Sequence, residues 1–152
     1  MRLLICAGGT GGGVYPALSV YEALKNKDAN LETLWVGGES GMEEALVNRA
    51  GISYRSIPAA GVHGVGLRAL PRNIFKLTRG ISESRKILNK FKPDVLFFTG
   101  GYVAAPMAFA GRNIPIVLYV PDIEPGLALK FLANFADVIT LTADVSKNIF
   151  IL

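Results

Sequence analysis

A glycine-rich turn at residues 8–13 follows directly after the first apolar run of the chain, residues 3–7. Five of its six residues are glycine, and Pro16 and an apolar pattern at helical spacing come next. Strands that end in a glycine turn and lead into a helix often bind phosphate, because the missing Cβ atoms let an anion approach backbone N–H groups. Such a turn can also serve only to pack a helix on a sheet, so both interpretations stay open.

The composition is that of a single domain with a buried sheet. The chain has 152 residues, of which 51% are hydrophobic and 18% charged, and a parallel sheet covered on both faces needs such an apolar sequence. The single cysteine, Cys6, cannot form an internal disulfide and is expected to be a small buried apolar residue. This suits a reducing, cytoplasmic compartment. We find neither a signal-peptide pattern nor an apolar run near the roughly 18 residues of a membrane-spanning helix.

Apolar runs and helical patterns alternate along the chain. Strands are expected at residues 3–7, 31–36, 54–57, 95–99, 116–119 and 138–141. Helices are expected at residues 16–26, 42–50, 72–91, 103–112 and 127–135, with a glycine-rich loop at 59–71 and a last helix capped by Asp144. The face of the long helix that should pack on the sheet comprises Ile74, Leu77, Ile81, Leu88 and Phe91, with Phe75 to one side. This alternation predicts a doubly wound α/β domain with a mostly parallel, Rossmann-like sheet.

A second glycine turn, Gly100 and Gly101 followed by Tyr102, comes after the fourth expected strand. If the strand order is the common 3-2-1-4-5-6, the first and fourth strands are neighbours and a crevice opens beyond their carboxyl ends. The two glycine turns would then face each other across this crevice. Two loops of backbone donors suit a diphosphate better than a single phosphate.

The loop at residues 120–126, on the rim of the same crevice, carries two carboxylates, Asp122 and Glu124. They can solubilise the loop and cap the following helix. Alternatively, one of them can contact a sugar hydroxyl or take its proton during glycosyl transfer. Asp122 lies nearer the end of the strand and is the better candidate for a catalytic base.

Other nucleotide and metal chemistries fit the sequence poorly. The dinucleotide fingerprint G-x-G-x-x-G fails in every register of the first glycine turn, and the P-loop lysine is missing. One histidine and one cysteine offer no cluster of metal ligands, so no metal site is expected. The histidine, His63, lies in the glycine-rich loop, where a solvated residue is expected rather than a general base.

Basic residues are concentrated in one segment. Between residues 68 and 92, eight basic side chains stand against a single acid, Glu83. At its start, cations mix with apolar side chains in a set that comprises Val65, Leu67, Arg68, Leu70, Arg72, Phe75, Lys76 and Arg79. Apolar groups ringed by cations favour an anionic membrane surface, with an ordinary basic helix face as the alternative. No nucleic-acid partner is expected, because Phe75 is the one aromatic platform in this set.

Motifs spread over the chain resemble the N-terminal domain of the MurG family, peptidoglycan N-acetylglucosaminyltransferases of the GT-B fold. The motifs that match are Gly8-Gly9-Thr10-Gly11-Gly12 with Tyr15-Pro16-Ala17-Leu18, Pro93-Asp94-Val95, Gly100-Gly101-Tyr102-Val103 with Pro106, and Ile114-Pro115-Ile116-Val117-Leu118. They run in the family's order over essentially the whole chain.

The resemblance implies one half of an inverting two-domain enzyme that moves a sugar, N-acetylglucosamine in this family, from a UDP-sugar to an acceptor on a polyprenyl diphosphate. No cofactor and no active-site metal are implied. Residues 1–152 would form the acceptor- and membrane-binding domain on the inner face of the cell membrane, and the donor-binding domain would lie outside this chain. The donor would contact Thr10, Gly11, Gly12 and Asp122. The acceptor diphosphate would contact Gly8, Gly9, Gly12, Gly13, Gly100, Gly101 and Tyr102.

Two departures from the family pattern fall where chemistry is expected. Gly13 stands where the family usually has a histidine implicated in catalysis, and residues 119–122, Tyr-Val-Pro-Asp, replace His-Glu-Gln-Asn. The donor-contacting asparagine thus becomes Asp122, and either Asp122 or Glu124 could replace the missing histidine. The acceptor could therefore differ from that of MurG. A further alternative is a non-catalytic, membrane-recruiting subunit of a split, two-chain glycosyltransferase.

Overall fold

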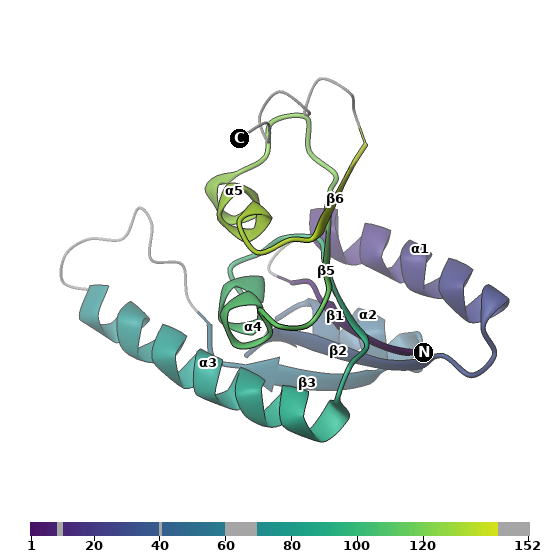
Figure 1. Ribbon diagram of the computed structural model, residues 1–152, viewed down its shortest axis with the longest axis horizontal. Helices are drawn as coiled ribbons and strands as arrows, with labels where there is room; N and C mark the ends of the chain where they lie inside the picture. Colours follow the sequence, from purple (N-terminus) through teal and green to yellow (C-terminus); the bar gives the residue numbers. More distant parts are fainter. Residues whose placement is uncertain (9–10, 40, 60–69, 143–152) are drawn as a thin grey trace.

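The computed structural model describes residues 1–8, 11–39, 41–59 and 70–142. In these ranges, six parallel strands form one sheet in the order β3-β2-β1-β4-β5-β6 (Figure 1), which confirms the predicted order. The strands are β1 (Arg2–Cys6), β2 (Glu32–Gly38), β3 (Ser53–Ile57), β4 (Val95–Phe98), β5 (Ile116–Val120) and β6 (Val138–Leu141). The helices are α1 (Gly11–Lys27), α2 (Glu43–Arg49), α3 (Leu70–Phe91), α4 (Ala104–Ala110) and α5 (Leu127–Ala133). His63 and the helix expected after Asp144 lie outside the described residues.

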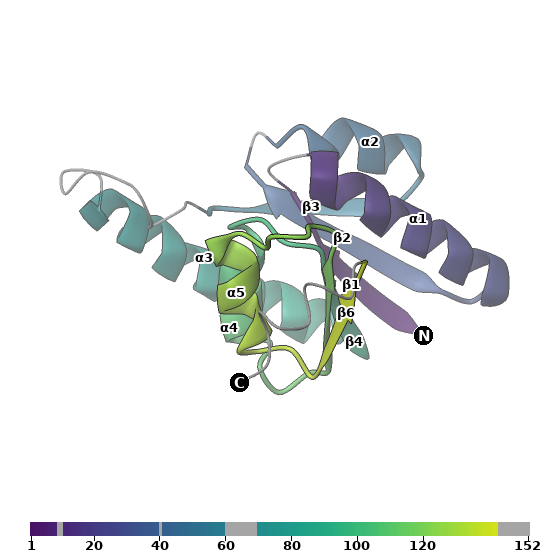
Figure 2. The ribbon, with the colours of Figure 1, turned by 90° about the horizontal axis from the view of Figure 1, so that it is seen from above.

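Helices cover both faces of the sheet (Figure 2): α1 and α2 lie on one face, and α3, α4 and α5 on the other. Successive residues of β1 point into the two layers, as the pleat of a strand requires. Leu4 and Cys6 pack with the residues of α3–α5, whereas Leu3 and Ile5 pack with those of α1 and α2. The unbroken apolar run of β1 is therefore explained by burial on both sides.

Cys6 is fully buried in this sheet. Burial raises the pKa of its thiol far above the ordinary value, and the nearby Glu43 carboxylate adds to the shift. The cysteine is thus a neutral part of the core, as predicted. None of the helices in the described ranges is long and apolar enough to cross a bilayer.

The expected start of the first helix is wrong. α1 begins at Gly11 rather than at Pro16, so three glycines of the turn form its first residues. Glycine has a low helix propensity, and for this reason the sequence pattern placed the start at the proline. Pro16 is the sixth residue of α1 and, having no N–H, leaves the carbonyl of Gly12 without its usual helical donor. The other predicted boundaries lie within two residues of those observed.

The long helix α3 does not pack along its whole length. Its 22 residues extend over about 33 Å, whereas even the seven residues of β2 span only about 23 Å. Its first turns project past the strands (Figure 1). Leu88, near its other end, is buried as predicted, but Ile74, which was predicted to pack on the sheet, is 48% exposed beside Phe75 at 68%.

Candidate functional site

The two glycine turns lie at the same level of the sheet. β1 and β4 are neighbours, and Cys6 pairs with Phe98 at their carboxyl ends. Gly8 follows Cys6 by two residues, and Gly100 follows Phe98 by two residues, so the two turns begin side by side. The sheet order reverses between these two strands, which is the point where open parallel sheets bind ligands.

Hydrogen bonds hold both turns in place. The Thr99 hydroxyl, at the end of β4, donates to the Gly13 carbonyl in the first turn of α1 at 2.8 Å. The buried indole N–H of Trp35 donates to the Ala7 carbonyl at 2.9 Å and so fixes the end of β1 directly before Gly8. The Thr99 bond therefore ties the two turns to each other, and the Trp35 bond fixes the strand end that leads into the first turn.

Packing inside the protein accounts for part of the glycine pattern. Gly101 has a φ of 84°, which L-residues with a side chain rarely adopt. A Cβ on Gly101 would collide with the Gly8 carbonyl, and one on Gly13 would lie 3.0 Å from the Thr99 hydroxyl. The missing side chains thus let the two turns touch each other, in addition to leaving backbone groups open to a ligand.

A cleft of about 200 Å³ opens between the two turns and the loop after β5. The predicted residues that line it together are Gly8, Gly12, Gly13, Gly100, Gly101 and Asp122. Glu124 is also exposed, but it does not line this cleft. Of the two carboxylates predicted in this loop, only Asp122 therefore lies on the wall of the cleft.

The amino end of α1 also faces the cleft, because Gly12 and Gly13 belong to both. A helix of 17 residues has a partial positive charge and unused backbone N–H groups at this end. Both features stabilise an anion. The cleft therefore combines backbone donors for phosphate oxygens with one carboxylate.

The remaining predicted residues lie elsewhere. Tyr102 is 47% exposed and lines a second cleft, of about 180 Å³, with the loop between β2 and α2. Gly11 is the half-buried first residue of α1. In α3, Arg72, Phe75 and Arg79 are exposed and Lys76 is half-buried. The predicted residues outside the described part of the chain are Gly9, Thr10, Val65, Leu67 and Arg68, and of Leu70 only the backbone is described.

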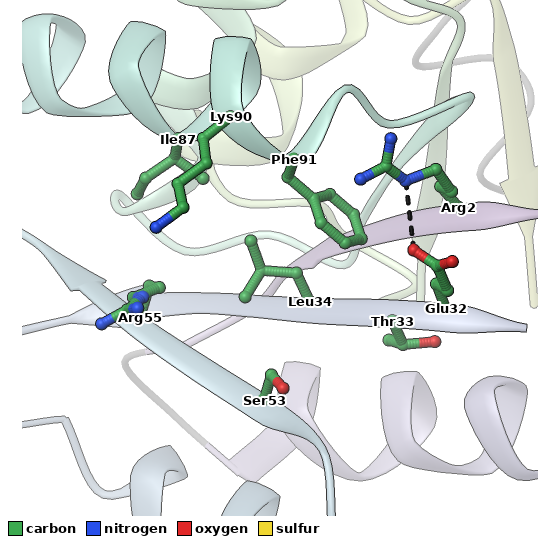
Figure 3. A pocket seen from close by; sticks show the side chains of 9 residues that line it. All are labelled: Arg2, Glu32, Thr33, Leu34, Ser53, Arg55, Ile87, Lys90 and Phe91. Atoms are coloured by element: carbon green, nitrogen blue, oxygen red, sulfur yellow. Dashed lines mark ion pairs between the residues drawn. The ribbon is translucent and has the colours of Figure 1, made fainter.

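A larger cavity, of about 510 Å³, lies at the opposite, amino end of the strands (Figure 3). There, Arg2 forms an ion pair with Glu32 at 3.2 Å and stacks over the ring of Phe91 at 4.9 Å. Arg55 and Lys90 lie at the other end of this cavity. Open parallel sheets bind their ligands beyond the carboxyl ends of the strands, so this cavity at the amino ends is separate from the site described above. Within the described ranges, no three His, Cys, Asp or Glu side chains are grouped to hold a metal ion.

Thr99 is a site residue that the sequence analysis did not single out, although it is the one polar residue between an apolar strand and a glycine turn. Thr99→Val removes its hydroxyl and leaves the Gly13 carbonyl without this donor. We expect the free energy of unfolding, measured by urea denaturation, to fall by about 1–3 kcal/mol.

Thr140→Val is the matched control for Thr99→Val. The hydroxyl of Thr140, on the edge strand β6, donates over a longer distance, 3.4 Å, to the Leu118 carbonyl of β5. Thr140→Val should lower the free energy of unfolding by less than about 0.5 kcal/mol. Equal losses for the two variants would contradict the role given to Thr99.

The parallel, doubly wound sheet with paired glycine turns at its switch point defines a Rossmann-like domain, a class of fold in which ligands bind at the carboxyl ends of the strands. Residues 3–141 match the model of the glycosyltransferase family 28 N-terminal domain. The chain therefore belongs to glycosyltransferase family 28.

Named relatives agree with this assignment. The UDP-N-acetylglucosamine--N-acetylmuramyl-(pentapeptide) pyrophosphoryl-undecaprenol N-acetylglucosamine transferase of Lactococcus lactis subsp. cremoris is 37% identical over 99% of this chain and 43% of its own length. The protein of the same name from Symbiobacterium thermophilum is 38% identical over 99% of this chain and 41% of its own. The chain thus spans less than half the length of these relatives.

Solved structures show the same fold. MurG from Acinetobacter baumannii has a TM-score of 0.78 and 29% identity, over 92% of this chain and 40% of that one. The UDP-GlcNAc 2-epimerase of Neisseria meningitidis, with a TM-score of 0.70 and 15% identity over 99% of this chain and 43% of that one, shares the fold alone. The predicted resemblance to the N-terminal half of MurG-like GT-B enzymes is confirmed.

Proposed function

We propose that this chain is the acceptor-binding half of an inverting, UDP-sugar-dependent glycosyltransferase. It would transfer N-acetylglucosamine to a lipid-linked acceptor of the polyprenyl diphosphate type. The observation that carries the proposal is the pair of glycine turns that meet across one cleft, with Asp122 on its wall. The donor and acceptor classes follow the names of the relatives, which transfer N-acetylglucosamine to a sugar on pyrophosphoryl-undecaprenol.

The cleft suits the diphosphate of such an acceptor. Backbone N–H groups at the amino end of α1 and in the glycine turns can donate to its oxygens, and the helix dipole offsets its charge. Thr10, Gly11 and Gly12 would contact the donor from the same side. We propose that transfer needs no metal and no cofactor, so EDTA should leave the rate unchanged.

In the transfer step, the acceptor hydroxyl attacks the anomeric carbon of the donor sugar from the face opposite to UDP. The new glycosidic C–O bond forms as the bond to UDP breaks, and UDP leaves with the electron pair, so the configuration inverts. The proton of the hydroxyl passes to the Asp122 carboxylate, which acts as the general base. The donor-binding half, in the same polypeptide or as a separate chain, would hold UDP.

Reconstitution tests the proposed function. The 152 residues alone should show no transfer from UDP-N-acetylglucosamine to a polyprenyl diphosphate-linked sugar, and addition of a donor-binding half from a family 28 relative should restore it. Product formation and UDP release are measured together. Transfer by the isolated chain, or none by the reconstituted enzyme, would overturn the proposal.

We propose that the exposed part of α3 is a membrane-docking surface and that this half lies on the cytoplasmic face of the cell membrane. Ile74 and Phe75 are large apolar side chains on turns that project past the sheet. Arg72 is exposed on the same turns, and Arg79 is exposed further along α3, next to the buried Gly80. Apolar groups can enter the headgroup layer while the cations bind anionic lipids.

Arg72→Glu combined with Lys76→Glu should weaken binding to anionic vesicles by about 30-fold or more, because each cation at such a surface contributes about 1 kcal/mol. Sedimentation with phosphatidylglycerol vesicles measures the affinity, and salt should release the wild type. Lys25→Glu with Lys27→Glu, at the end of α1, is the control and should change binding little. Equal binding by the two double variants would contradict a docking surface on α3.

A further inference from the structure

A carboxylate lies buried behind the glycine turns. Glu43, the first residue of α2, has no exposed surface, although ionisable side chains are almost never fully buried unless they are paired. Its Oε1 accepts a hydrogen bond from the backbone N–H of Gly38 at 2.9 Å. Its Oε2 is also buried and has no hydrogen-bond partner among the described residues.

Glycines make the space that this carboxylate occupies. A Cβ on Gly8, on Gly37 or on Gly41 would collide with the Glu43 carboxylate. The three glycines come from different places: the end of β1, the end of β2 and the loop before α2. At these positions the absence of a side chain therefore serves Glu43, whatever it also does for a ligand.

A series of contacts leads from Glu43 to the cleft. Gly8 packs against the carboxylate on one side, and on the other side its carbonyl lies against Gly101 of the second turn. The Tyr54 hydroxyl donates to the Gly38 carbonyl at 3.2 Å and also lies beside the Glu43 carboxylate. Burial, followed by the Glu43 carboxylate, raises the pKa of Tyr54 far above its ordinary value, so its hydroxyl stays a donor.

We propose that Glu43 is a positioning residue for the glycosyl-transfer site. Its carboxylate holds the first glycine turn at the height at which that turn meets Gly101 and the diphosphate of the acceptor. The proposal rests on the function proposed above. Gly8 has no side chain of its own to restrict it, and here the restriction comes from Glu43 on α2.

A side chain that only filled space at this position would not be expected to carry a charge. Burying a carboxylate is unfavourable, and an apolar residue of similar volume would avoid this loss. An apolar side chain, however, could not accept the Gly38 N–H. The carboxylate therefore fixes the turn after β2 by a hydrogen bond and the turn after β1 by contact.

Three variants of the complete enzyme test this proposal. Glu43→Gln keeps the shape and the acceptor oxygen and should retain kcat/KM within about threefold. Glu43→Ala removes both and should raise the KM for the acceptor about tenfold or more, with a smaller change in the KM for the donor. Glu44→Ala, on the adjacent exposed residue, is the control and should match the wild type.

If Glu43→Ala does not fold, Glu43→Asp takes its place. Its shorter side chain should also raise the KM for the acceptor more than the KM for the donor. Amide hydrogen exchange at Gly8 and Gly101 gives a readout that does not depend on catalysis: it should accelerate in Glu43→Ala or Glu43→Asp and not in Glu43→Gln. If the wild type transfers no sugar, the proposed function fails, and exchange alone decides whether Glu43 positions the turn. Unchanged exchange, or a proportional loss for both substrates, overturns the positioning role.

Discussion

In the complete enzyme, Asp122→Asn should lower kcat by about 10²-fold or more while the KM for the UDP-sugar changes little. The amide keeps the size and one acceptor oxygen of the carboxylate but cannot take the proton of the acceptor hydroxyl. Asp122 is exposed on the wall of the cleft between the two glycine turns. We expect a hydroxyl of an acceptor whose diphosphate is bound on those turns to reach it.

Glu124→Gln makes the matching control, because this carboxylate belongs to the same loop but does not line the cleft. Its kcat should stay within about twofold of the wild type. Steady-state rates at varied donor and acceptor concentrations separate the possible roles. A raised donor KM with an unchanged kcat in Asp122→Asn would make this residue a donor contact and would refute its role as the base.

The sheet could be predicted from the sequence because its signals are local. Residues 3–7 are apolar without interruption, and only a strand covered on both faces needs that pattern. The alternation of such runs with helical patterns then leaves few topologies, and the observed order is the commonest of them. Because this order makes β1 and β4 neighbours, it also predicts that the glycine turns after these two strands face each other.

The sequence analysis was wrong where tertiary structure, rather than the local pattern, decides exposure or the start of a helix. Periodicity put Ile74 on the apolar face of α3, but it does not say how far a helix extends past the strands that it covers. The low helix propensity of glycine hid the true start of α1, where three glycines are held in helical conformation beside Thr99. In both cases tertiary packing overrode a correct local preference.

Glu43 shows what sequence reasoning could not supply. An acidic residue at the first position of a helix is ordinarily an exposed group that stabilises the helix dipole. Its burial depends on glycines at three separate turns that converge only in the folded sheet. Thr99 is similar, because the partner of its hydroxyl, the Gly13 carbonyl, lies 86 residues away in the chain.

Gly101→Ala should be among the most destabilising substitutions in this domain. At a φ of 84°, a residue with a Cβ is unfavourable by about 1–2 kcal/mol. The new methyl group would also collide with the Gly8 carbonyl, and overpacking of this kind costs about 1–3 kcal/mol. The colliding atom belongs to the backbone, so no change of rotamer can relieve the contact, and the combined loss should reach about 3 kcal/mol or more.

Gly51→Ala separates the two contributions. Gly51 also has a positive φ, 70°, but nothing lies within 4 Å of the position of its Cβ. It should therefore lose only the backbone contribution, about 1–2 kcal/mol in urea denaturation. The difference between the two variants then measures the contact between the two glycine turns. Equal losses would mean that the turns do not touch, and a cleft whose walls are not held against each other could not fix a diphosphate against Asp122.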